Sequence, residues 1–314
     1  MALGEWMERE VCEQPDLLAR QSDRYFTELS AAFSGKSYDL VVLTARGSSD
    51  NAALYLRYLV EIHLGIPVSL AAPSVITQHK TAMRYPKSLF VGISQSGAAP
   101  DVSEVLAYAR GLGHDTLGIT NTADSRLTEA ASRSLILEAG PERSIAATKT
   151  YSASLLASAQ LVRALGGNLG EPVLPDRSWL ESSREAAESA SGHIVRCSPV
   201  FSLGRGYSYC TAVETALKLM ECALIPCKSY SIADFHHGPK ALAGPNTACV
   251  LFGEVPVDLR ATGATVVEAP QADFGPWSPL WTIFFGQWLA LLASRARGID
   301  PDTAQNLSKV TETL

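Results

Sequence analysis

The sequence predicts an α/β fold with two similar units, each a mainly parallel sheet flanked by helices. Short apolar runs alternate with longer helical patterns along the 314 residues. Such runs are typical of strands buried on both faces, and strand–helix alternation favours parallel pairing. The chain also exceeds the about 250–300 residues at which a single core stops growing. We therefore expect two domains, at residues 1–168 and 176–314.

In the first domain, an N-terminal helix precedes five predicted strands. These strands are Leu40–Leu43, Val68–Ala71, Leu89–Ile93, Thr116–Ile119 and Leu135–Leu137. Helical patterns occupy Asn51–His63, Asp101–Gly111, Ser125–Ala131 and Thr148–Leu165. The last helix ends at a Gly-Gly pair, and residues 168–176, rich in Gly and Pro, are typical of a linker.

The second domain begins with a predicted helix at Arg177–Val195. Predicted strands follow at Val200–Leu203, Ala248–Phe252 and Thr265–Glu268, and the last long helix is Leu280–Arg295. Both domains contain a strand, an Arg-Gly turn and a helix in succession, which indicates a duplicated unit. The second copy is shortened, because residues 253–264 are about the minimum for a parallel crossover. The helix of that crossover should be short or missing.

The composition limits the classes of partner. Lys and Arg number 26 and Asp and Glu number 32, so the net charge is −6. A phosphate backbone selects a basic face, so we expect no nucleic-acid partner. No run reaches the about 18–20 apolar residues of a membrane helix, and we expect neither membrane association nor a signal peptide. The six cysteines form no C-x-x-C pair, which favours reduced thiols in a cytoplasmic protein.

Two Ser-rich turns follow predicted strands of the first domain. Gly47-Ser48-Ser49 comes after Leu40–Leu43, and Ser94-Gln95-Ser96-Gly97 comes after Leu89–Ile93. Serine hydroxyls and the amides of a helix N-terminus can together bind a phosphate. The second turn taken alone could equally be a helix cap. Because the carboxyl ends of parallel strands open into one crevice, the two turns together favour an anionic ligand.

An acid–base group is predicted on the helix after the second Arg-Gly turn. Glu214, Lys218 and Glu221 have the spacing i, i+4 and i+7, which places them on one face. An exposed ion-paired stripe would have the same spacing. The apolar residues around them indicate instead that little of this helix is solvated. A partly buried Glu beside a Lys is suited to act as a general base.

The other ionisable cluster is His236-His237-Gly238-Pro239. The Gly-Pro pair predicts a turn that presents the imidazole from a loop, although a surface His pair would have the same sequence. Adjacent His residues are poorly placed to share a metal, and no other Cys or His has ligand spacing, so we expect no metal site. Lys309 gains no role from its spacing and could belong to a tail.

With these stretches, the sequence resembles the sugar isomerase (SIS) domain family. The resemblance covers nearly the whole chain. Within the family, the sequence resembles the isomerase half of glutamine–fructose-6-phosphate aminotransferases, and it resembles SIS-type glucosamine-6-phosphate deaminases more closely. The matching segments are Arg46-Gly47-Ser48-Ser49, Ser94-Gln95-Ser96-Gly97, Ala139-Gly140-Pro141-Glu142, Ala147-Thr148-Lys149, Leu203-Gly204-Arg205-Gly206, Glu214 to Glu221, His237-Gly238-Pro239 and Asn306-Leu307-Ser308-Lys309.

The resemblance implies two tandem SIS domains that bind a hexose or hexosamine 6-phosphate without a cofactor. The implied binding residues are Gly47, Ser48, Ser49, Ser94, Gln95 and Ser96. Positions 99 and 147 belong to the same binding segments, but Ala99 and Ala147 replace a Thr and a Ser of the family.

The resemblance also implies catalytic roles. Glu221 is the implied base that moves a proton between C1 and C2, and Glu214 and Lys218 line the pocket. His237 assists ring opening and reaches the site of the neighbouring subunit, so a homodimer is expected. Lys309 closes over the sugar.

We therefore expect an enzyme, an aminosugar-phosphate deaminase/isomerase that converts glucosamine 6-phosphate to fructose 6-phosphate and ammonia. Three alternatives stay open: a fructosamine 6-phosphate deglycase, an ammonia-dependent aminotransferase subunit, and a non-catalytic sugar-phosphate-binding protein. The presence of Glu221 and His237 favours an enzyme over the last of these.

Overall fold

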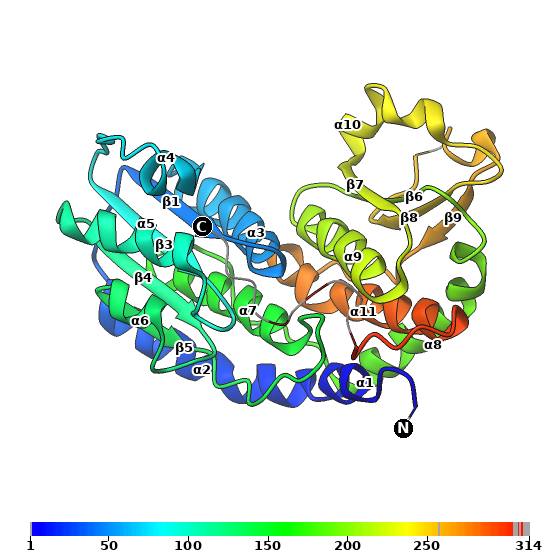
Figure 1. Ribbon diagram of the computed structural model, residues 1–314, viewed down its shortest axis with the longest axis horizontal. Helices are drawn as coiled ribbons and strands as arrows, with labels where there is room; N and C mark the ends of the chain where they lie inside the picture. The colour runs from blue at the N-terminus through cyan, green and yellow to red at the C-terminus, as the bar shows by residue number, and fades with distance from the viewer. Residues whose placement is uncertain (1, 257, 304–306, 308, 310–314) are drawn as a thin grey trace. The chain divides into compact units, whose positions relative to one another are not determined.

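The computed structural model describes residues 2–256, 258–303, 307 and 309, which form two compact units (Figure 1). One unit contains residues 17–141 and 150–172. The other contains residues 2–16 and 142–149 together with the described residues from 173 to 309. The predicted boundaries at 168 and 176 stay a prediction. Asn306 and Ser308, which belong to the last matching segment, lie outside the described residues.

The first unit is built on a five-stranded parallel sheet in the order β2-β1-β3-β4-β5. Its strands are β1 (Leu40–Ala45), β2 (Val68–Leu70), β3 (Ser88–Ile93), β4 (Asp115–Thr120) and β5 (Arg133–Ile136). All five overlap predicted strands, although β5 begins two residues before the predicted Leu135–Leu137. The central strands β1 and β3 are almost wholly buried, as their continuous apolar runs indicated.

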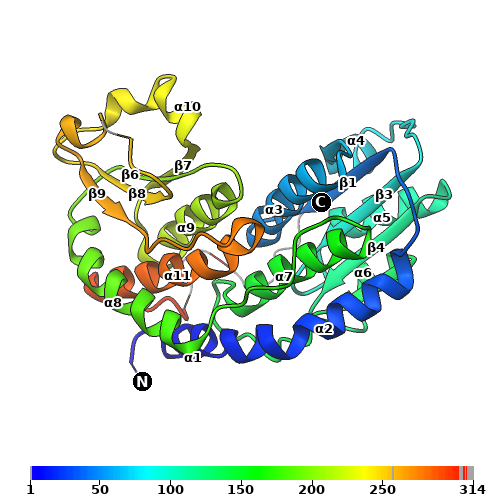
Figure 2. The same cartoon turned by 180° about the vertical axis from the view of Figure 1, so that it is seen from behind.

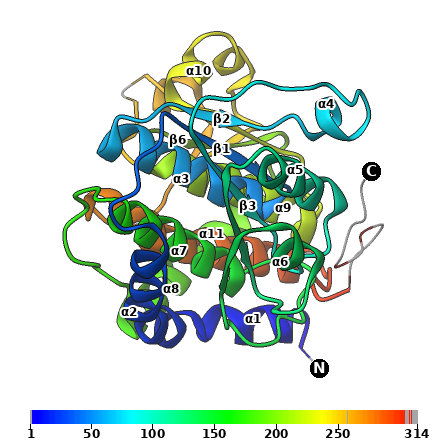
Figure 3. The same ribbon diagram turned by 90° about the vertical axis from the view of Figure 1, so that its left-hand side faces the viewer.

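Helices cover both faces of this sheet, so the predicted fold class is confirmed (Figure 3). The helices that belong mainly to this unit are α2 (Gln14–Phe33), α3 (Ser48–Leu64), α4 (Pro73–Thr77), α5 (Pro100–Gly111), α6 (Arg126–Ala130) and α7 (Lys149–Ala164). The core on one face joins Val42 and Phe90 of the sheet to Val105 and Leu106 of α5 and Leu127 of α6. Because β2 and β4 lie on opposite sides of the β1–β3 pair, right-handed crossovers carry α3 and α5 to opposite faces.

The second unit repeats this plan with a four-stranded parallel sheet in the order β7-β6-β8-β9 (Figure 2). Its strands are β6 (Val200–Gly204), β7 (Cys227–Ser231), β8 (Ala248–Phe252) and β9 (Thr265–Glu268). The edge strand β7 was not predicted, because its sequence is polar and half-exposed rather than an apolar run. Between β8 and β9 the described residues contain only the 3-10 turn Arg260–Thr262, as the short connection predicted.

The helices of the second unit are α1 (Glu5–Cys12), α8 (Arg177–Ile194), α9 (Ser208–Ala223), α10 (Ile232–His236) and α11 (Ser278–Ala296). Helix α11 is apolar nearly all round because it packs against both α8 and α9. None of the helices in the described ranges combines the length and apolar character that crossing a membrane requires.

Candidate functional site

The two Ser-rich turns lie side by side at the carboxyl ends of the central strands β1 and β3 of the five-stranded sheet. The last residues of β1 and β3, Ala45 and Ile93, pair directly. The chain then continues into Ser48 and Ser49 at the start of α3, and into residues 94–97 before α5. Since α3 and α5 leave these strands toward opposite faces, the turns flank the switch point of the sheet, where α/β folds bind ligands. The structure thus brings together the residues predicted to bind phosphate in this unit.

Backbone contacts from the end of β4 hold the second turn in place. The carbonyl oxygen of Gln95 accepts hydrogen bonds from the Asn121 amide at 3.0 Å and the Thr120 hydroxyl at 3.2 Å. Gly97 has a φ of +65°, and a Cβ there would overlap the Ser125 side chain. The turn therefore requires glycine at position 97.

Arg46 supplies a positive charge beside both turns. Its guanidinium pairs with the Asp101 carboxylate at 2.6 Å, and Asp101 lies in the first turn of α5. The Asp101 side chain is 4% exposed whereas that of Arg46 is 50% exposed. The pair links the two turns and leaves the cation accessible, which suits an anionic ligand.

Ala99 has no hydroxyl group to offer at the carboxyl end of β3. Ala99 precedes α5 and packs its methyl group against the hydrophobic core. Its carbonyl oxygen accepts a hydrogen bond from the Ser103 hydroxyl at 3.0 Å. The side chains that can bind an anion at this turn are therefore those of Ser94, Gln95 and Ser96.

Helix α9 of the second unit carries the predicted acid–base residues on one face. The Lys218 ammonium lies 3.4 Å from the Glu214 carboxylate and 2.5 Å from that of Glu221. Glu214 and Lys218 are buried, but the Glu221 side chain is 25% exposed. Burial alone would lower the pKa of Lys218, but the carboxylates of Glu214 and Glu221 raise it above its ordinary value. Lys218 therefore stays charged, and Glu221 is the accessible member of the group.

His236 and His237 lie at the end of the short helix α10, and both are exposed. Gly238 follows with a φ of +139°, and Pro239 opens a 3-10 turn. The predicted turn is present, and it leaves the imidazole of His237 accessible on the surface.

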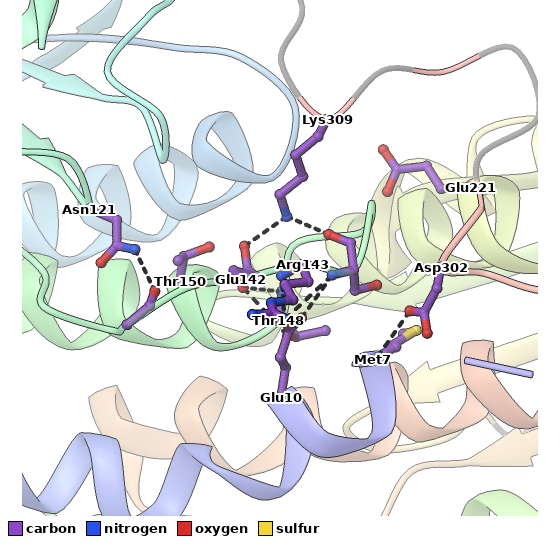
Figure 4. A network of polar contacts seen from close by, with 12 residues as sticks. Met7, Glu10, Asn121, Glu142, Arg143, Thr148, Thr150, Glu221, Asp302 and Lys309 are labelled. Carbon is purple, nitrogen blue, oxygen red and sulfur yellow. Dashed lines mark hydrogen bonds and ion pairs between the residues drawn. The ribbon is translucent and has the colours of Figure 1, made fainter. Parts of the chain in front are cut away.

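Lys309 contacts the segment that precedes α7 (Figure 4). Its ammonium donates to the Glu142 carboxylate at 3.2 Å and to the Ser144 carbonyl oxygen at 2.5 Å. The other oxygen of Glu142 accepts the Thr148 amide at 3.0 Å, so Glu142 shapes the segment that includes Ala147. Glu142 was part of a matching motif but had no predicted role of its own.

Glu10 is a further polar group of this region that the sequence analysis did not identify. It lies on α1, is 2% exposed, and accepts hydrogen bonds from the backbone amides of Arg143 and Ser144. The available signal was the spacing of Met7, Glu10 and Val11, which places Glu10 on the buried stripe of the helix.

Comparison with known proteins identifies relatives over most of the chain. The family model described as SIS domain matches residues 38–164 and 193–259. The glutamine–fructose-6-phosphate aminotransferases (isomerizing) of Streptococcus pyogenes and Methanothermobacter thermautotrophicus are 28% and 31% identical over 97% of this chain. The chain spans 58% and 57% of the lengths of these two relatives.

Solved structures with the same fold also cover nearly the whole chain. A candidate phosphosugar isomerase from Silicibacter pomeroyi superposes with a TM-score of 0.81 at 28% identity, covering 94% of this chain and 99% of that one. A glucosamine-6-phosphate deaminase from Thermotoga maritima shares the fold, with a TM-score of 0.83 at 23% identity over 98% and 100% of the two chains. The predicted enzyme class agrees with these relatives.

Proposed function

We propose that this chain, which belongs to the SIS domain family, is an aminosugar-phosphate deaminase/isomerase. The substrate is glucosamine 6-phosphate, and the products are fructose 6-phosphate and ammonia. The glucosamine-6-phosphate deaminase of Thermotoga maritima supports this substrate class through its shared fold.

The observation that carries the proposal is that Glu221 is partly exposed beside the buried Lys218 ammonium. A base that abstracts a carbon-bound proton must be ionised and accessible to substrate. Glu221 is the accessible carboxylate of its group, with a side chain that is 25% exposed, and it lies 2.5 Å from the Lys218 ammonium. Glu214 pairs with the same ammonium from the buried side, so Lys218 is held between the two carboxylates.

The two Ser-rich turns supply phosphate binding in this proposal. Ser48, Ser49, Ser94 and Ser96 offer hydroxyl groups, and hydrogen bonds to a charged acceptor contribute about 1.5–3 kcal/mol each. The start of α3 and the Arg46 side chain add positive potential. Phosphate binding keeps the sugar in place while its other end reacts.

The reaction is a proton transfer followed by hydrolysis. His237 assists opening of the sugar ring, which gives a C1 aldehyde and a C2 amine. Glu221 removes the proton from C2 and returns it to C1, while O1 gains a proton and the amine loses one; the amino aldehyde is thereby converted to a C1 alcohol with an imine at C2. Water adds to the imine, ammonia leaves, and fructose 6-phosphate remains. Lys309 contacts the sugar, and His237 acts from the partner subunit of a homodimer.

The test is a paired assay of ammonia and fructose 6-phosphate formed from glucosamine 6-phosphate. We expect equal amounts of the two products from the unmodified protein. Glu221→Gln should abolish turnover and retain binding of fructose 6-phosphate, measured by calorimetry. Glu185→Gln, on the exposed face of α8, is the matched control and should keep full activity.

Other outcomes would contradict the proposal. Activity on a fructosamine 6-phosphate without activity on glucosamine 6-phosphate would identify a deglycase. Tight binding of sugar phosphates without turnover would identify a binding protein. Retained turnover in Glu221→Gln would show that another group is the base.

A further inference from the structure

Helix α1 contacts the chain on the N-terminal side of Lys309. The Asp300 carboxylate accepts the Gly4 amide at 2.9 Å, and the Asp302 carboxylate accepts the amides of Trp6 and Met7 at 2.7 and 3.0 Å. These amides belong to the helix N-terminus, where they lack partners within the helix and favour negative charge. The first turn of α1 therefore anchors residues 300–302.

The same helix also contacts the segment to which Lys309 binds. Glu10 lies about one turn after the Asp302 contacts and accepts the amides of Arg143 and Ser144 (Figure 4). These are successive peptide groups directly after Glu142. The carboxylate has two oxygens and accepts one amide at each, whereas a side chain with a single acceptor oxygen would satisfy the two buried amides less well.

Lys309 binds the opposite side of that backbone. Ser144 donates its amide to Glu10 and accepts the Lys309 ammonium at its carbonyl oxygen. The second partner of the ammonium, the Glu142 side chain, lies next to the amides that Glu10 holds. Displacement of residues 142–144 would therefore move both acceptors of Lys309 together.

We propose that Glu10 is a positioning residue that places Lys309 through the backbone of residues 142–144. Helix α1 then contacts both residues 300–302 and the backbone that carries the binding partners of Lys309. The proposal rests on the proposed function only in that Lys309 contacts the sugar; the placement of Lys309 is independent of the substrate.

The first experiment measures the placement without any substrate. The protein is acetylated briefly with an N-hydroxysuccinimide ester, and labelling of each lysine is quantified by mass spectrometry. In Glu10→Ala, the labelling rate of Lys309 should rise several-fold, and Glu142→Ala, which removes a direct partner, should have the same effect. Lys36, paired with Asp115 in the other unit, is the internal reference. Glu5→Gln, an exposed residue on α1, is the matched control and should change nothing.

An unchanged Lys309 rate in folded Glu10→Ala would overturn the proposal, whatever the catalytic result. Should Glu10→Ala fail to fold, Glu10→Gln retains one acceptor oxygen and should give a smaller rise in labelling. No rise in that folded variant would equally overturn the proposal.

The second experiment tests whether Glu10 acts through Lys309. Turnover of glucosamine 6-phosphate should fall in Glu10→Ala and in Lys309→Ala, but the double variant should be no slower than Lys309→Ala. Additive losses would mean that Glu10 acts independently of the lysine. If the unmodified protein does not turn over this sugar phosphate, the proposed function fails while the labelling result still decides the role of Glu10.

Discussion

Glu10 is a buried carboxyl group of the second unit. Burial raises its pKa to about 7, and the nearby charge of Glu142 adds to the rise, while the amides of Arg143 and Ser144 oppose it. A carboxyl group whose pKa is higher in the folded protein binds its proton more tightly there than in the unfolded chain. Its contribution to stability is therefore complete below about pH 4.5 and is lost as the pH rises through about 7.

This shift predicts a pH dependence of stability that a single substitution removes. Between pH 4.5 and 7, the free energy of unfolding of the unmodified protein should fall by about 3 kcal/mol relative to that of Glu10→Gln. Urea denaturation of both proteins at intervals across this range measures the difference. A constant difference between the two proteins would mean that Glu10 titrates near its ordinary pKa.

At the residue scale, the sequence allowed prediction of burial where neighbouring residues were informative. Apolar residues surround Glu214 and Lys218 in sequence, and both are buried as expected. Glu10 lies among the charged residues of a short helix, and its burial depends on residues 143 and 144, more than 130 positions away. Local sequence patterns do not contain such a contact.

At the scale of elements, α9 is held against α11 by a close approach at one glycine. A Cβ added to Gly286 would overlap the Thr215 hydroxyl and lie 3.2 Å from its Cβ. Thr215 is fully buried and β-branched, so it has little freedom to rotate away. Thr215 lies one residue after Glu214, so this packing sets where the acid–base face of α9 points.

Gly286→Ala should therefore destabilise the protein. Alanine favours a helix over glycine by about 1 kcal/mol, but overpacking a core costs about 1–3 kcal/mol, and here the overlap should prevail. The melting temperature should fall in Gly286→Ala, measured by calorimetry. When the overlapping hydroxyl is removed in Thr215→Ala, the same glycine substitution should become neutral or stabilising. The same loss in both backgrounds would show that Thr215 is not the obstacle.

The elements that sequence patterns predicted are those with continuous or periodic apolar runs. The buried strands β1, β3 and β8 and the long helices α7, α8 and α11 lie where expected. Strand β7 pairs with β6 through its backbone. Its sequence contains Lys228, Ser229 and Tyr230 in succession, so it has no apolar run. Pairing at a sheet edge depends on the neighbouring strand and is weakly encoded in the residues themselves.

At the scale of the whole molecule, the duplication inferred from two Arg-Gly turns is borne out by the topology. The order β7-β6-β8-β9 repeats β2-β1-β3-β4, and a long helix, α3 or α9, follows the corresponding central strand, β1 or β6. The copies have diverged in the turns at the ends of those strands. After their Arg-Gly pairs, the first copy continues with Ser48-Ser49 and has a second Ser-rich turn after β3, whereas the second copy continues with Tyr207-Ser208 into the acid–base helix α9.

The proposed homodimer leads to a prediction about mixed subunits. If His237 acts at the partner's site, Glu221→Gln and His237→Ala each inactivate a homodimer for a different reason. In a mixed dimer, the subunit that carries His237→Ala keeps its own Glu221 and receives His237 from its partner, so one of the two sites is complete. Random mixing makes half of the dimers mixed, so about a quarter of the activity should return.

The measurement requires that subunits exchange, so the two variants are mixed in denaturant, refolded together and assayed against each variant refolded alone. Sedimentation of the mixture establishes that dimers have formed. The exposed position of His237 at the end of α10 is consistent with a role outside its own chain, because its imidazole is not enclosed by the subunit that carries it. Dimers without recovered activity would place His237 and Glu221 in the same subunit's site. Recovery well above a quarter would mean that one of the two variants had never lost its function.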